Sequence, residues 1–247
     1  MFDLTGNVAL VTGAGQSVGA GIAATLAEAG AKVAVNDLFP ERADASAAAI
    51  NDQGGIAVAA PFDVTDLEAT RNGVAKIEVD LGPVDILVNN AGIALTMRAA
   101  QFRDLDPAEW RATIDLNLFG VLNCVRATID GMCERGWGRV ITISSGAGTV
   151  GLDIGVSMYA AGKGGAISFM RHLALETAKF GVTANSLALG MMENNQRRIP
   201  DARIPKLNPV GRLGTGREVG AAIVWLAAEG SWVTGQTIEI NGGVVTT

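Results

Sequence analysis

Short apolar runs alternate with longer amphipathic stretches along nearly the whole chain, and only a few architectures satisfy such an order. The runs are rich in valine and isoleucine, which favour strands. We expect strands at residues 7–12, 31–36, 55–61, 84–89, 138–144, 182–188 and 236–240. We expect helices at residues 18–29, 41–53, 66–81, 107–135, 157–180 and 217–229. Helices between successive strands indicate a parallel sheet, because each parallel connection must cross over it.

The strands expected at 84–89 and 138–144 are apolar almost throughout, as strands are when helices cover both faces of their sheet. We therefore predict an α/β fold with one doubly wound parallel sheet of about seven strands and helices on both faces. No repeat or low-complexity stretch divides the chain, so we expect a single domain over residues 1–247. Ligands of such a sheet bind at the carboxyl ends of its strands.

Charge and cysteine content disfavour several functions. A net charge of −6 would repel a nucleic acid. Asp3 stands where a signal peptide would be basic, and no apolar run approaches the roughly 18 residues needed to span a membrane. We therefore expect a cytoplasmic protein with neither a nucleic acid nor a membrane as partner. Cys124 and Cys133 lie too far apart on one expected helix for a disulfide, and no metal-ligand companions surround them.

A glycine-rich turn from Thr12 to Gly19 joins the first expected strand directly to the first expected helix. Glycine allows backbone to approach a pyrophosphate, and the helix N-terminus offers free N–H groups. An isolated turn of this kind is as often empty as occupied. The next strand, however, ends at Asp37, where a carboxylate can bind the ribose hydroxyls of NAD and repel the 2′-phosphate of NADP. Since no base follows Asp37 before Arg42, we expect NAD as the cofactor.

Tyr159 and Lys163 lie one helical turn apart at the start of the helix expected at 157–180. A lysine cation favours the phenolate, so we expect a lowered pKa for Tyr159. Such a tyrosine can exchange a proton with an alcohol or ketone oxygen, to which Ser145 would donate a hydrogen bond. Pairs with this spacing often arise by chance, but Tyr159 is the only tyrosine and follows a dinucleotide turn. We therefore predict NAD-dependent hydride transfer between the nicotinamide and a small-molecule secondary alcohol or ketone, with Tyr159 as general acid/base.

In the order and spacing of its motifs, the sequence resembles the short-chain dehydrogenase/reductase family, which has a Rossmann-like fold, over essentially its whole length. The matching segments are Thr12 to Gly19, Asp63-Val64, Asn89 to Gly92, Leu116 to Leu118, Ser145, Tyr159 to Lys163, Gly235-Gln236 and Asn241 to Gly243. The resemblance implies a tetrad of Asn117, Ser145, Tyr159 and Lys163, in which Asn117 distorts its helix and holds a water for a proton relay. With the glycine turn and Asp37, it implies cofactor contacts from Gly13, Gln16, Ser17, Val18, Gly19, Asp37, Leu38, Asp63, Val64, Asn90, Ala91, Gly92, Tyr159, Lys163, Gly190, Met192 and Asn194.

Three residues depart from the family pattern. Ser17 replaces a glycine, Leu189 a proline and Asn194 a threonine. Their effect on the phosphate turn, on the backbone over the nicotinamide and on the carboxamide contact stays open.

The substrate is expected between Leu95-Thr96, the loop at 146–158 and a covering segment at about 190–209. Leu152, Val156, Met191 and Met192 would form an apolar wall. The family commonly pairs the helices expected at 107–135 and 157–180 between subunits, which implies a homotetramer. Two alternatives are an NADPH-dependent 3-ketoacyl-type reductase, which Asp37 disfavours, and a non-catalytic dinucleotide-binding protein, which has no use for the tetrad.

Overall fold

The computed structural model describes residues 2–93, 95, 97–193 and 208–246. Its strands form one sheet with the order β3-β2-β1-β4-β5-β6-β7, and all neighbouring pairs are parallel. The strands are β1 (Val8–Val11), β2 (Lys32–Val35), β3 (Ile56–Ala59), β4 (Ile86–Asn89), β5 (Gly138–Ser145), β6 (Val182–Leu189) and β7 (Thr237–Ile240). The α-helices are α1 (Ser17–Glu28), α2 (Pro40–Asp52), α3 (Leu67–Asp80), α4 (Trp110–Ile114), α5 (Gly120–Arg135), α6 (Ser157–Thr177) and α7 (Gly216–Ala228). The predicted fold class is confirmed.

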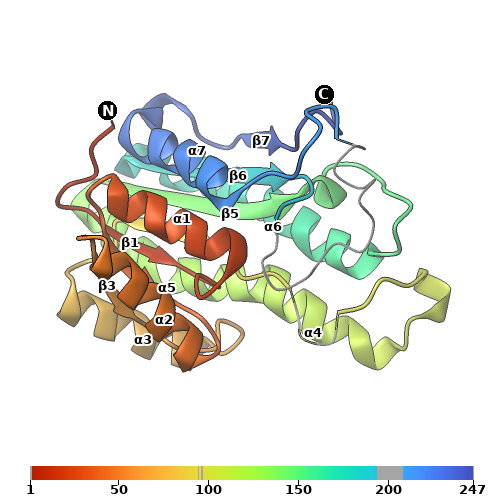
Figure 1. The fold of residues 1–247 in the computed structure, drawn as a ribbon, viewed down its shortest axis with the longest axis horizontal. Coiled ribbons are helices and arrows are strands. Elements are labelled where there is room, and N and C mark those ends of the chain that lie inside the picture. The colour runs from red at the N-terminus through yellow and green to blue at the C-terminus, as the bar shows by residue number, and fades with distance from the viewer. Residues whose placement is uncertain (1, 94, 96, 194–207, 247) are drawn as a thin grey trace.

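Helices cover both faces of the sheet. Helices α1, α2 and α7 pack on one face, and α3, α5 and α6 pack on the other (Figure 1). Strand β1 packs against both helical layers. Ala9 and Val11 face α1, α2 and α7, while Val8 and Leu10 face α3, α5 and α6. This alternation of side chains explains why a strand buried on both faces is apolar at every position.

The range expected as a helix, 107–135, is helical throughout, but it is not one regular α-helix. A 3₁₀ turn at Pro107–Glu109 precedes α4, and a π-helical turn at Asp115–Phe119 separates α4 from α5. Within this turn Asn117 Nδ2 donates a hydrogen bond to the carbonyl of Thr113 at 2.9 Å. The side chain thus competes for the carbonyl that the α-helical pattern would give to a backbone amide, which favours a local distortion. The distortion that the family resemblance implied is therefore present.

The strand order reverses beside β1, which pairs with β2 on one side and with β4 on the other. The connections that leave β1 and β4 therefore diverge to opposite sides and open a crevice at their carboxyl ends. Among the described residues, both cysteines are free, no helix is long and apolar enough to cross a membrane, and no acidic, histidine or cysteine cluster could hold a metal.

Candidate active site

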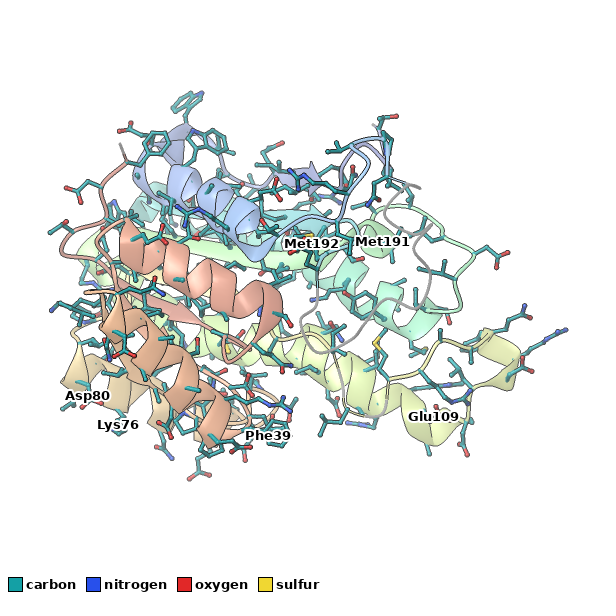
Figure 2. The ribbon with its side chains drawn as sticks, viewed as in Figure 1. Phe39, Lys76, Asp80, Glu109, Met191 and Met192 are labelled. Atoms are coloured by element: carbon teal, nitrogen blue, oxygen red, sulfur yellow. The ribbon has the colours of Figure 1, made fainter. Side chains whose placement is uncertain are left out.

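A cavity of about 830 Å³ lies along the carboxyl edge of the sheet. Figure 2 shows two of its lining residues, Phe39 after β2 and Met192 after β6, well apart from one another, so the cavity is elongated. The expected site residues that line it are Gly13, Gln16, Ser17, Val18, Gly19, Asp37, Leu38, Val64, Asn90, Ala91, Gly92, Ser145, Tyr159, Lys163, Gly190 and Met192. The structure therefore brings the glycine turn and three of the four predicted catalytic residues to one space, whereas Asn117 is not part of the lining.

The glycine turn is packed tightly against the end of β4. Asn90 Nδ2 donates hydrogen bonds to the carbonyls of Thr12 and Gly13, at 2.9 and 3.0 Å. A Cβ at residue 19 would lie 2.2 Å from the carbonyl oxygen of Gly13, which no side chain tolerates. Gly19 therefore lets α1 start directly against the turn, with its N-terminus facing the cavity where a pyrophosphate can accept N–H groups.

Ser17 occupies the position of the family's second turn glycine and has a left-handed backbone, with φ of +49°. It is the only non-glycine residue with positive φ in the described part of the chain. This conformation costs an L-residue roughly 1–2 kcal/mol. The turn therefore keeps a backbone conformation that favours glycine, at an energetic cost.

We predict that the free energy of unfolding is about 1 kcal/mol higher for Ser17→Gly than for Ser17→Ala. Both changes remove the hydroxyl and its interactions, so their difference reports the backbone strain, less the entropy that glycine adds to the unfolded chain. Urea denaturation of the two variants measures it. Equal stabilities would show that residue 17 carries no strain.

Asp37 is buried at the end of β2, with 6% of its surface exposed. Its Oδ2 accepts a hydrogen bond from the Gly15 N–H at 3.2 Å, and its Oδ1 accepts one from the Phe39 N–H at 3.1 Å. The carboxylate is thus fixed where a ribose would lie. The guanidinium of Arg42 stacks on the Phe39 ring at 4.2 Å, and Arg42 lines the same cavity, so a positively charged residue lies near Asp37.

Ser145 ends β5, and Tyr159 lies in the first turn of α6. Burial raises the pKa of Tyr159 above its usual value, and a hydrogen bond with Ser145 acts in the opposite direction. The Ser145 hydroxyl oxygen also accepts a hydrogen bond from the Ala147 N–H at 3.2 Å. The pair is therefore preformed, with the phenol in its protonated state at neutral pH.

Lys163 lies one turn further along α6 and is 3% exposed. Its Nζ donates a hydrogen bond to the carbonyl of Ile143 at 2.7 Å and lies 5.7 Å from the centroid of the Tyr159 ring. Burial lowers the pKa of Lys163 to about 8. The expected lowering of the Tyr159 pKa is wrong for this arrangement, because desolvation of the phenol outweighs its hydrogen bond with Ser145.

Asn117 is fully buried behind Lys163. A Cβ on Gly92 would lie 2.6 Å from Lys163 Nζ and 3.0 Å from Asn117 Oδ1, so both atoms border the same small space. Asn117 Oδ1 has no hydrogen-bond partner among the described residues. An unpaired buried acceptor beside a lysine suits a water between the two side chains, which is the relay that the resemblance implies.

These features fit a dinucleotide. The turn offers backbone N–H donors and a helix N-terminus. Gln16 lines the cavity, and its Oε1 is a buried acceptor without a partner among the described residues. Asp37 would hold the ribose at one end. At the other end the nicotinamide would lie between Gly190 and Tyr159, which both line the cavity.

Two expected contacts are not placed in the cavity. Asp63 is absent from its lining, and its Oδ1 accepts hydrogen bonds from the Thr65 N–H and hydroxyl at 2.9 and 2.8 Å. A cofactor contact from Asp63 stays a prediction. Asn194 lies outside the described residues, as does most of the covering segment expected at 190–209.

Sequence reasoning missed several lining residues, namely Phe39, Arg42, Phe62, Thr65, Ile93, Ala112, Asp115 and Leu116. Phe39 and Arg42 follow closely after Asp37, and this proximity is the one signal that could have found them. Of the expected apolar wall, Met192 lines the cavity, while Met191 and Leu152 are exposed. Val156 lines a separate small cavity beside Tyr159.

Comparison with known proteins agrees with this geometry. Residues 7–200 match the family model described as short chain dehydrogenase. Acetoacetyl-CoA reductase of Shinella zoogloeoides is 41% identical over 242 residues, which cover 96% of this chain and 97% of that protein.

Two solved structures are similar throughout. A gluconate 5-dehydrogenase from Burkholderia cenocepacia, in complex with NADP and tartrate, has a TM-score of 0.91 and 36% identity and covers 98% of this chain and 96% of its own. A 3-oxoacyl-[acyl-carrier protein] reductase with bound NAD from Brucella melitensis has a TM-score of 0.92 and 33% identity, covering 99% and 93%. The cavity, the residues that surround it and the extent of these matches show that the chain belongs to the short-chain dehydrogenase family.

Proposed function

We propose that this protein reduces the 3-oxo group of an acyl thioester to a 3-hydroxy group, with NAD(H) as its cofactor. The observation that carries the proposal is the buried Ser145–Tyr159 pair at the wall of a dinucleotide-sized cavity. The names of two relatives, an acetoacetyl-CoA reductase and a 3-oxoacyl-[acyl-carrier protein] reductase, support the substrate class. They favour the 3-ketoacyl alternative over the unspecified alcohol or ketone of the main sequence-based prediction.

A bound nicotinamide supplies the hydride, and the chain supplies the proton. As the carbonyl carbon is reduced, the Tyr159 hydroxyl transfers its proton to the ketone oxygen while the Ser145 hydroxyl donates a hydrogen bond to that oxygen. Because burial raises the pKa of Tyr159, the phenol is protonated at neutral pH, which is the state that reduction requires. Lys163 Nζ lies 5.7 Å from the centroid of the Tyr159 ring, and Asn117 Oδ1 borders the same small space as Nζ. The Lys163 ammonium would return a proton to the phenolate, through a water that Asn117 holds in place.

The choice of NAD(H) rests on Asp37. Its carboxylate is held by two backbone N–H groups, so it cannot turn away from a ribose 2′-phosphate. NADP(H) is the second candidate, because Arg42 lines the cavity beside Phe39 and could pair with that phosphate. The complex of the gluconate 5-dehydrogenase with NADP also favours it.

We expect Asp37→Asn to shift the ratio of NADPH to NADH affinity toward NADPH by about 10- to 100-fold, because the change removes the repulsion and keeps one acceptor oxygen. Titration of each reduced cofactor, followed by its fluorescence, measures the ratio. Arg42→Ala is the matched control, since it should lower the affinity for NADPH and leave the affinity for NADH unchanged. If the unsubstituted protein binds NADPH more tightly than NADH, the NAD proposal is wrong.

Activity assays test the substrate class. The purified protein should oxidise NADH when given an acetoacetyl thioester, and it should leave gluconate unoxidised in the presence of NAD. Turnover of gluconate without reduction of the thioester would replace the proposed substrate by a sugar acid. The homotetramer stays a prediction from the family resemblance.

A further inference from the structure

A second, much smaller cavity of about 20 Å³ lies beside Tyr159. Its walls come from the segment between β4 and α5 and from the loop before α6, and Tyr159 lines both this cavity and the large one. The small cavity thus lies next to the proposed acid/base. Of its lining residues, only Tyr159 is expected to contact the cofactor. A space of this volume admits one water or one oxygen-sized polar group.

The walls of the small cavity are fixed by their own contacts. Arg98 and Glu109 form a bidentate pair at 3.0 and 2.9 Å, and Arg98 also donates to the carbonyl of Asp104 at 3.1 Å. The Ala100 N–H donates to the carbonyl of Gly155 at 2.8 Å, which ties the two walls together. In Figure 2, Glu109 lies on the part of the chain that extends away from the sheet. These contacts hold the cavity open without help from a ligand.

Trp110 begins α4 and lines the small cavity. Its ring stacks on Phe102, with 5.2 Å between the centroids. The indole Nε1 is buried and has no hydrogen-bond partner among the described residues. Buried indole N–H groups usually find an acceptor, and an unmade hydrogen bond costs free energy. Trp110 thus brings an unsatisfied donor to the wall of the small cavity.

Trp110 lies seven residues before Asn117, and both α4 and the π-helical turn that holds Asn117 pack on α6. The indole donor and Asn117 are thus carried by one segment, which packs on the helix of Tyr159. A 3-oxoacyl thioester has two carbonyl groups, which are separated by one carbon atom. When one oxygen binds at Tyr159 and Ser145, the second must lie close by.

We propose that the Trp110 indole N–H binds the thioester carbonyl of a 3-oxoacyl substrate inside the small cavity. The inference rests on the proposed function and adds the residue that selects a 1,3-dicarbonyl over a simple ketone. A site built to pair with a polar group discriminates strongly against analogues that lack it. Two hydrogen-bonded oxygens of the substrate then fix the position of the reacting carbonyl: the ketone oxygen at Tyr159 and Ser145, and the thioester oxygen at Trp110.

The test compares Trp110→Phe with the unsubstituted protein on two probes, the acetoacetyl thioester of N-acetylcysteamine and 2-heptanone, which has one carbonyl. The variant keeps an aromatic ring against Phe102 and loses only the donor and part of the ring area. We expect kcat/KM for the thioester to fall roughly 10- to 100-fold, and kcat/KM for 2-heptanone to change less than about threefold. Phe102→Leu is the control for packing, because it removes the stacking partner and retains the N–H.

An equal loss on both probes, or a loss in Phe102→Leu that matches the loss in Trp110→Phe, would overturn the role of Trp110 and assign it to packing or to a bound water. Unchanged kcat/KM in Trp110→Phe would overturn it as well. Failure of the proposed function looks different, because the unsubstituted protein would then reduce no 3-oxoacyl thioester at all.

Discussion

Replacing Tyr159 by phenylalanine should lower turnover by about 10²- to 10⁴-fold and leave cofactor affinity and stability nearly unchanged. The change removes one hydroxyl, and with it the group that we propose as the proton donor to the reacting oxygen. The ring remains in its buried place on α6, and the Ser145 hydroxyl keeps the hydrogen bond from Ala147. Steady-state rates for the acetoacetyl thioester measure the loss, while NADH fluorescence titration and urea denaturation report binding and folding.

The unsubstituted protein provides a direct check on the state of the phenol. Tyr159 is the only tyrosine, so the tyrosinate absorbance of the native protein reports this residue alone. We expect its pKa to lie above the usual value of about 10, because desolvation outweighs the hydrogen bond with Ser145. Tyr159→Phe should abolish the signal. Near-parent turnover in that variant would exclude Tyr159 as the acid/base and reopen the non-catalytic interpretation.

The order of elements could be predicted because each depends on a local pattern. Every expected strand is present, and the parallel order follows from the helices between the strands. The π-helical turn around Asn117 could not be predicted from the residues themselves, because a polar residue inside a helix is compatible with several hydrogen-bond partners. Only the three-dimensional contact with the Thr113 carbonyl, or a family resemblance, identifies it.

The proposed catalytic pair of Tyr159 and Lys163 could be selected from its spacing, but the pKa values of the two residues could not be predicted from it. Spacing places Lys163 one turn from Tyr159 and says nothing of how deeply either is buried. Burial decides both pKa values here, since it disfavours phenolate and ammonium alike. Likewise, Arg42 follows closely after Asp37 in the sequence, but this spacing alone does not show that both residues line one cavity.

Lys163→Met should stabilise the folded protein at pH 7 by an amount on the order of 1–3 kcal/mol while it lowers activity strongly. Burial lowers the pKa of Lys163 from 10.5 to about 8, so at pH 7 the folded chain holds a buried ammonium that the unfolded chain exposes to water. Each unit of such a difference corresponds to about 1.4 kcal/mol. Methionine has a similar length and no charge, and it suits an irregular buried site.

The pH dependence separates this electrostatic cost from ordinary packing. Between pH 8 and 10.5 the unfolded chain still binds a proton at Lys163 while the folded chain has lost it, so the stability of the unsubstituted protein rises with pH in this window. Below pH 8 both states are protonated and the cost is fully present. The advantage of Lys163→Met should therefore be largest at pH 7 and should shrink toward pH 10.5.

Urea denaturation at pH 7, 9 and 10 gives the free energy of unfolding of Lys163→Met and of the unsubstituted protein. The difference between the two values at each pH cancels the titration of the groups that both proteins share. A difference that stays constant with pH would show that Lys163 is not a buried cation. The expected trend would show that the fold bears the cost of a charge that only catalysis requires, because the Ile143 carbonyl is the one hydrogen-bond partner of Nζ among the described residues. Lys163 forms no ion pair with a carboxylate among these residues either, so a single hydrogen bond compensates the buried ammonium.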